Sequence, residues 1–142
     1  MNFKNEVGAV ILRIIIGIIF FVHGFVKFQG GIENIAGWFD SIGIPGFMAY
    51  IVASIELVGG IALIIGLGTR VVSVLFVLVM LGAIIKVKLA VGFLGDGKMA
   101  GYELDLAFLA ISLFLAINGS KLLSAGQLLV KDKSTAGTHK TY

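Results

Sequence analysis

The sequence of 142 residues contains no cysteine and a single proline, and only 13% of its residues are charged. Without cysteine, the chain has no disulfides, thiolate metal ligands, cysteine-ligated iron–sulfur clusters or thiol redox chemistry. A typical soluble domain carries about 25% charged residues. A charged fraction this low cannot solvate a globular surface, and the composition argues against a soluble fold.

The chain also lacks any cluster of basic residues that would bind nucleic acid. Its net charge is +3 and its pI is near 9.3, but the bases are scattered among apolar segments and a short tail. Positive charges beside membrane spans set orientation and attract lipid head groups. We therefore expect membrane lipid, not nucleic acid, as a partner.

The sequence instead contains four long apolar stretches, at residues 7–28, 47–67, 71–91 and 102–118. A membrane-spanning helix needs roughly 20 mostly apolar residues. None of the four has an amphipathic period, and helices that are apolar on all sides belong in lipid. These stretches predict an all-α integral membrane protein, with a four-helix bundle over residues 1–121. A short amphipathic segment and a flexible cytoplasmic tail would follow over residues 122–142.

The connections between the stretches carry further predictions. In residues 29–46, Ile35, Phe39 and Ile42 share one helical face beside Trp38, which predicts a short helix lying in the membrane interface. The glycine-rich turn at 66–70 is so short that the second and third spans must be antiparallel neighbours.

The C-terminal segment predicts a further short helix. Ser120 is the expected cap of an amphipathic stretch that runs through Val130. Residues 131–142 are expected to be disordered.

An even number of spans places both termini on the same side of the membrane. Cytoplasmic segments collect lysine and arginine, and more of these residues group with the termini than with the opposite side. Both termini are therefore expected in the cytoplasm, in a multi-pass protein of the cell membrane. The bases near the termini are Lys4, Arg70, Lys121, Lys131, Lys133 and Lys140, against Lys27, Lys86, Lys88 and Lys98 on the other side.

Eight ionisable residues fall within or beside the predicted spans. Such residues are costly in a bilayer, so they usually face the bundle interior, pair with one another and mark function. At about 1.5 Å per residue, seven of them lie within about 12 Å of the non-cytoplasmic helix ends, whereas Arg13 lies roughly 22 Å away. The seven form one polar layer in which three lysines balance three carboxylates: His23, Lys27, Glu56, Lys86, Lys88, Glu103 and Asp105.

Two interpretations of this layer are open. Lys27, Lys88 and Glu103 are close enough to helix ends to extend outward to water. The deeper residues are expected to form an interior network, which would serve either as structural support or as a binding site. These are Glu56, His23, Lys86 and Asp105.

The chemistry available to the layer is limited. His23 is the only histidine within the spans, so the chain cannot supply paired axial haem ligands, and no spacing typical of a metal site is present. What remains is proton exchange, or hydrogen bonding to a small polar head group whose tail lies in lipid. A quinone, a lipid and a small aromatic compound all fit that description.

Several motifs together carry a family resemblance. They are Leu12-Arg13 with Gly17, the segment from Phe20 to Lys27, the segment from Glu56 to Arg70, and Tyr102-Glu103-Leu104-Asp105. Over about residues 5–121 the sequence resembles the DoxX family of small four-helix membrane proteins. Residues 28–31, 92–95 and 116–121 are similar to its CatD branch.

The resemblance implies a cytoplasmic-membrane protein of a kind described as an oxidoreductase or a quinol-oxidase-like subunit, linked in the CatD branch with catechol or quinone stress. It also implies a set of signature residues, although the family offers no redox centre. These are Arg13, His23, Lys27, Glu56, Glu103 and Asp105.

Two hypotheses follow. In the first, the layer binds a quinone or related aromatic without any covalent cofactor, and a redox partner protein carries the electrons. The catalytic residues would be Lys86 and His23, as donors to the quinone oxygens, and Glu56, which exchanges protons. The substrate-binding residues would be Arg13, Lys27, Lys88, Glu103 and Asp105.

In the second hypothesis the protein is a non-enzymatic small transporter or scaffold, and the charges only stabilise the bundle. Under either hypothesis a homodimer is expected to form, because so small a bundle should enclose little volume and a site between chains would be roomier.

Overall fold

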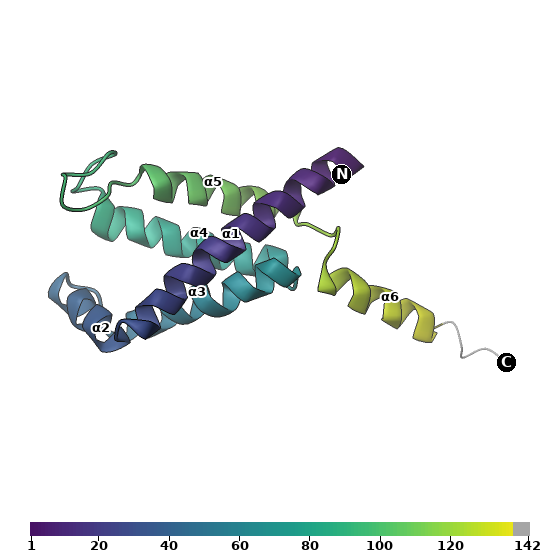
Figure 1. Ribbon diagram of the computed structural model, residues 1–142, viewed down its shortest axis with the longest axis horizontal. Helices are drawn as coiled ribbons and strands as arrows, with labels where there is room; N and C mark the ends of the chain where they lie inside the picture. The colour runs from purple at the N-terminus through teal and green to yellow at the C-terminus, as the bar shows by residue number, and fades with distance from the viewer. Residues whose placement is uncertain (138–142) are drawn as a thin grey trace.

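The computed structural model describes residues 1–137, and within this range every regular element is helical (Figure 1). A single isolated bridge, between Gly95 and Ala100, closes the loop before α5. The elements are α1 (Phe3–Gln29), α2 (Ile32–Ser41), α3 (Phe47–Ile65), α4 (Thr69–Ala83), the π-helical turn η1 (Ile84–Lys88), α5 (Glu103–Asn118) and α6 (Ala125–Gly137).

The longer helices form two packed pairs, α1 with α3 and α4 with α5. The pairs meet near the α3–α4 turn and diverge toward α2 and the loop of residues 89–102 (Figure 1). The first residue of α1 and the start of α6 both lie at the end where the pairs meet. The bundle is therefore closed at one end and divergent at the other.

A core cluster holds the two pairs together. It contains Ile16 and Phe20 from α1, Leu63 from α3, Phe76 and Met80 from α4, and Leu115 from α5. The rings of Phe20 and Phe76 stack with their centroids 3.9 Å apart. Because these side chains come from four helices, the cluster fixes how one pair sits against the other.

The α3–α4 turn depends on two glycines. Gly66 ends α3 with φ = 77°, and Gly68 precedes α4 with φ = 60°. Other residues adopt such left-handed conformations at a cost. The turn spans only three residues, and the predicted antiparallel arrangement of these helices is confirmed.

Helices α1 and α3 approach each other through small residues. A Cβ atom placed on Gly24 would lie 2.5 Å from the backbone nitrogen of Leu57, and one placed on Gly60 would lie 2.5 Å from that of Phe21. Small residues allow membrane helices to pack this closely. The glycines are therefore required for the observed distance between the backbones.

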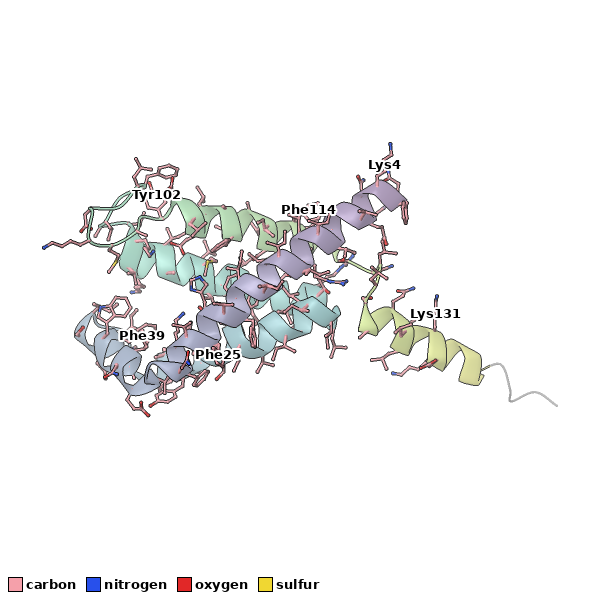
Figure 2. The ribbon with its side chains drawn as sticks, viewed as in Figure 1. Lys4, Phe25, Phe39, Tyr102, Phe114 and Lys131 are labelled. Carbon is pink, nitrogen blue, oxygen red and sulfur yellow. The ribbon has the colours of Figure 1, made fainter. Side chains whose placement is uncertain are left out.

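Three helical segments are long and apolar enough to cross a membrane: α1, α3 and the combined segment Thr69–Lys88. Most of each apolar segment is not buried within the protein, and apolar side chains project outward along the helices (Figure 2). Helix α5 has 16 residues, or about 24 Å, which is shorter than the ~30 Å hydrocarbon core. The fold is thus that of an all-helical membrane protein, and its fourth predicted span is shorter than the other three.

The short helix predicted between the first two spans is present as α2. Its Ile32, Ile35 and Phe39 pack on Ala49 and Ala53 of α3. The connection to α3 is fixed by Asp40, whose Oδ1 accepts a hydrogen bond from the Gly46 amide at 2.8 Å. Helix α2 is thereby held at the divergent end of the bundle.

The loop between η1 and α5 has its own polar support. Oδ1 of Asp96 accepts hydrogen bonds from the backbone amides of Met99 and Lys98, at 2.9 and 3.0 Å. These two bonds favour the carboxylate and hold the pKa of Asp96 below its usual value. The rings of Phe93 and Tyr102, both in this loop, meet edge to face.

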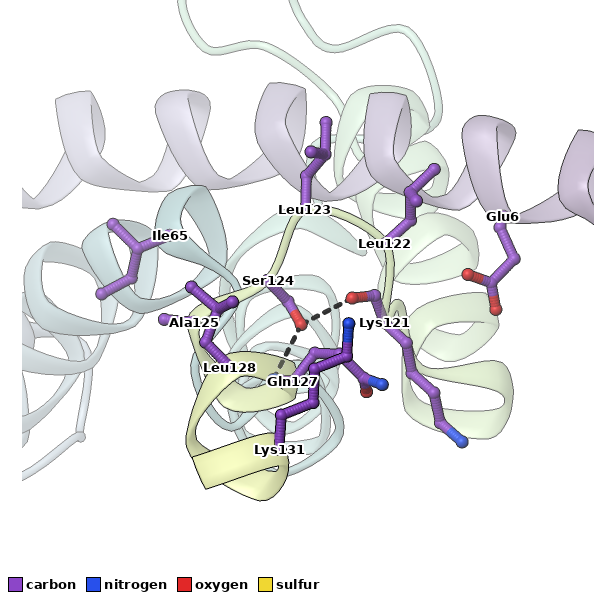
Figure 3. Close-up of a pocket in the computed structure, with 10 residues that line it drawn as sticks. All are labelled: Glu6, Ile65, Lys121, Leu122, Leu123, Ser124, Ala125, Gln127, Leu128 and Lys131. Atoms are coloured by element: carbon purple, nitrogen blue, oxygen red, sulfur yellow. Dashed lines mark hydrogen bonds between the residues drawn. The ribbon is translucent and has the colours of Figure 1, made fainter. Parts of the chain in front are cut away.

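The C-terminal helix differs from its prediction. It begins after Ser124, whose hydroxyl accepts a hydrogen bond from the Gln127 amide at 3.2 Å and donates one to the Lys121 carbonyl at 2.7 Å (Figure 3). The prediction that Ser120 caps this helix is wrong, because the Ser120 hydroxyl instead accepts a bond from Arg13.

Helix α6 is also longer than predicted. It continues through residues 131–137, where disorder was expected, and that part of the prediction is wrong. Residues 138–142 of the expected flexible tail lie outside the described residues. The linker before α6 and the helix itself border a cavity of about 640 Å³ (Figure 3).

Candidate functional site

The two diverging helix pairs enclose a cavity of about 780 Å³. This volume is within the ~300–1,000 Å³ range of small-molecule sites. The wall is mostly apolar and includes four aromatic residues, Phe20, Trp38, Phe39 and Phe108. The expectation that so small a bundle would enclose little volume is wrong, because the pairs diverge instead of packing along their whole length.

Six of the eight predicted site residues line this cavity. They come from α1, α3, η1 and α5, and they reach the cavity because all four elements carry their charges toward the divergent end. The six are His23, Lys27, Glu56, Lys86, Lys88 and Asp105.

Lys27 and Glu56 form the most buried charged contact of the cavity. Nζ of Lys27 lies 2.7 Å from Oε2 of Glu56, and Glu56 is only 4% exposed. His23 lines the same cavity. The outward orientation expected for Lys27 is not observed, since a carboxylate buried this deeply is costly without a cationic partner.

A second pair lies on the opposite wall. Nζ of Lys88 is 3.4 Å from Oδ2 of Asp105, so Lys88 also turns inward and not outward as expected. Within residues 1–137 no donor makes a directed hydrogen bond to this oxygen, which is buried. The ion pair with Lys88 therefore offsets the burial of this carboxylate oxygen.

Lys86 differs from the other two lysines of the cavity. It lines the cavity but is more exposed, and it forms no ion pair with any residue of the described chain. The π-helical turn η1 carries Lys86, Val87 and Lys88 past the cavity, with the Leu89 amide donating to the Ile84 carbonyl at 2.9 Å. Such wide turns occur often at functional sites.

Two predicted binding residues lie elsewhere. Glu103 is exposed in the first turn of α5, outside the cavity lining. Arg13 is fully buried at the closed end of the bundle, where it donates to the carbonyls of Ser120, Leu122 and Leu123, the last at 2.9 Å. The structure gives Arg13 a contact with the α5–α6 linker in place of a contact with the cavity.

Sequence reasoning missed most of the aromatic wall. Trp38 and Phe39 were assigned only to an interfacial helix face, and Phe108 drew no attention. Phe108 lies one helical turn after Asp105, so the spacing that brings Asp105 inward was the available signal. The π-helical turn has no sequence signature that we recognise.

Within residues 1–137, no group of three or more His, Asp or Glu side chains gathers in a way that could hold a metal ion. The polar groups of the cavity are instead two ion pairs, one histidine and one lysine without an ionic partner. They can donate hydrogen bonds to a ligand, accept them from it and exchange protons with it.

The fold and the cavity define a small all-helical membrane protein with a charged pocket among its helices. The DoxX family model matches residues 8–89, more than half of the chain, and the protein belongs to the DoxX family. The resemblance read from the sequence motifs is thus confirmed.

Among curated proteins, the chain is 48% identical to the Bacillus subtilis protein named "Putative oxidoreductase CatD", over 94% of this chain and 95% of that one. It is 32% identical to "Uncharacterized membrane protein Rv3486" of Mycobacterium tuberculosis, over 96% and 90% of the two chains. It is 33% identical to "Inner membrane protein YqjF" of Escherichia coli, over 49% and 53%. No solved structure matches the chain significantly.

Proposed function

We propose that the cavity binds a quinone or a related small aromatic compound and that the protein is the ligand-binding membrane component of an oxidoreductase. The observation that carries this proposal is the mostly apolar, aromatic-walled cavity into which six ionisable residues project. An apolar wall with a few convergent polar groups is typical of sites for small organic ligands. The name of the Bacillus subtilis relative supports the oxidoreductase assignment.

Each polar residue of the cavity has a role in this proposal. Lys86 and His23 donate hydrogen bonds to ring oxygens, and Glu56 exchanges protons with the ligand while Lys27 compensates its charge. Lys88 orients Asp105. A chain without cysteine, and with one histidine in its spans, lacks side chains for an iron–sulfur cluster or a bis-histidine haem, so a partner protein supplies or accepts the electrons.

Ligand binding is tested by thermal unfolding of the purified full chain in detergent, with menaquinone, ubiquinone or catechol added. A ligand that binds only the folded state at about 100 times its Kd stabilises that state by about 2.7 kcal/mol. We expect the unfolding temperature of the wild type to rise with at least one of these compounds and that of Glu56→Gln to rise much less.

The double variant Lys27→Gln with Glu56→Gln serves if the single variant does not fold, because it removes both buried charges together. Absence of stabilisation by all three compounds in a well-folded wild type would count against ligand binding. The charges would then have a structural role, as in a transporter or scaffold.

We further propose that α5 also crosses the membrane, giving four spans with both termini in the cytoplasm of the cell. Lys27, Lys86 and Lys88 face the cavity, which leaves Lys98 as the exposed loop base on the side opposite the termini. Without the three cavity lysines, the bases near the termini outnumber those on the opposite side by more than a count along the sequence suggests.

The absence of cysteine allows a direct test of this topology. With single cysteines introduced as Lys98→Cys or Lys4→Cys, we expect a membrane-impermeant maleimide to label the first in intact cells and the second only after lysis. The reverse pattern would place the termini outside. A homodimer stays a prediction, although the cavity forms within one chain and does not need a second copy.

A further inference from the structure

The charges around the cavity do not cancel. Lys27 pairs with Glu56 at 2.7 Å, and Lys88 pairs with Asp105 at 3.4 Å. Lys86 lines the same cavity and has no ionic partner among residues 1–137. Three lysines and two carboxylates leave an excess of one positive charge before any contribution from His23.

The wall indicates the shape of a ligand that would neutralise this charge. Phe20, Trp38, Phe39 and Phe108 line the cavity, and the rings of Phe20 and Phe108 are tilted with their centroids 6.0 Å apart. Aromatic side chains pack well against flat rings in offset or edge-on arrangements.

We infer that Lys86 makes the cavity selective for an aromatic ligand that carries one negative charge on a ring oxygen. This inference rests on the proposed function and narrows its ligand class. A neutral ligand leaves Lys86 without a counter-charge in an apolar setting, whereas an anionic ring oxygen provides one. Because Lys86 is exposed, the preference is moderate, about fivefold in Kd.

The test uses two ligands of nearly equal size, one anionic and one neutral. The probes are 2-hydroxy-1,4-naphthoquinone, which is ionised at neutral pH, and neutral 2-methoxy-1,4-naphthoquinone. Trp38 is the only tryptophan of the chain and lines the cavity. Quenching of its fluorescence therefore reports occupancy in the purified full chain.

For the wild type we expect the anionic probe to bind about fivefold more tightly than the neutral one. In Lys86→Gln the ratio of the two Kd values should fall about fivefold, whereas Lys86→Arg should keep it. Comparing this ratio between variants removes the different partition of the probes into detergent. Lys98→Gln, at an exposed loop position outside the cavity, is the matched control and should behave as the wild type.

The outcomes separate this inference from the proposed function. If the ratio of the two Kd values is the same in the wild type and in Lys86→Gln, Lys86 does not select for charge and this inference is wrong. The cavity remains a binding site in that case. If neither probe binds, the proposed function fails and this inference fails with it.

Discussion

Replacing Gly24 with alanine should lower the free energy of unfolding by about 2–3 kcal/mol, because overpacking a close contact costs roughly this amount. The added Cβ would lie 2.5 Å from the Leu57 nitrogen and 2.9 Å from the Ala53 carbonyl oxygen. These are backbone atoms of α3, so the clash cannot be relieved by a change of rotamer. Helices α1 and α3 must therefore move apart at Gly24, which lies one helical turn before Lys27 of the Lys27–Glu56 pair.

Equilibrium unfolding in detergent measures this effect, and α1 offers a matched control. A Cβ on Gly8 would have no atom within 4 Å. Gly8→Ala should therefore be neutral or stabilise by up to ~1 kcal/mol, as alanine does in place of glycine in a helix. Equal effects of the two substitutions would show that α1 and α3 are not held at this distance.

Replacing Arg13 with methionine should destabilise the protein by about 3 kcal/mol and release α6 from the bundle. The guanidinium donates to three carbonyls and one hydroxyl of the α5–α6 linker. Buried acceptors that lose a donor cost about 1–3 kcal/mol each, and the cost of burying the arginine offsets part of the total.

Trypsin cleavage after Lys121 reports this release and should become faster in Arg13→Met. Arg70→Gln is the control, because Arg70 is an exposed arginine that makes one bond to the neighbouring Asn118 carbonyl, at 3.3 Å. It should change stability and cleavage little. If Arg13→Met keeps its stability but loses ligand binding, the binding role suggested by the sequence would return.

The polar layer was predictable in outline because depth along a helix can be counted from sequence. Residues within two or three turns of the same helix ends must lie at similar depth, and six of these residues do surround one cavity. Which charged residues pair with one another could not be predicted in this way. Lys27 sits near a helix end, where extension to water is ordinary, and only the position of α3 beside α1 shows that Glu56 is within its reach.

Arg13 shows a second limit. Its depth set it apart from the layer, but its partners are linker carbonyls more than a hundred residues away in the chain. Any backbone carbonyl accepts hydrogen bonds regardless of side chain, so no sequence pattern marks these acceptors. Ser120 was mistaken for a helix cap for a related reason. Its hydroxyl can accept a hydrogen bond from a helix amide or from a guanidinium, and the sequence does not show which donor is present.

The two ion pairs of the cavity each lie within one helix pair. Lys27–Glu56 joins α1 to α3, and Lys88–Asp105 joins η1 to α5. Among the described residues, no ion pair crosses from one helix pair to the other. Moving the pairs apart at the divergent end therefore separates no opposite charges that are in contact. If the proposed aromatic ligand binds in this cavity, the ion pairs would therefore oppose a wider ring little, and selection by ring size would depend on the apolar packing of the two pairs.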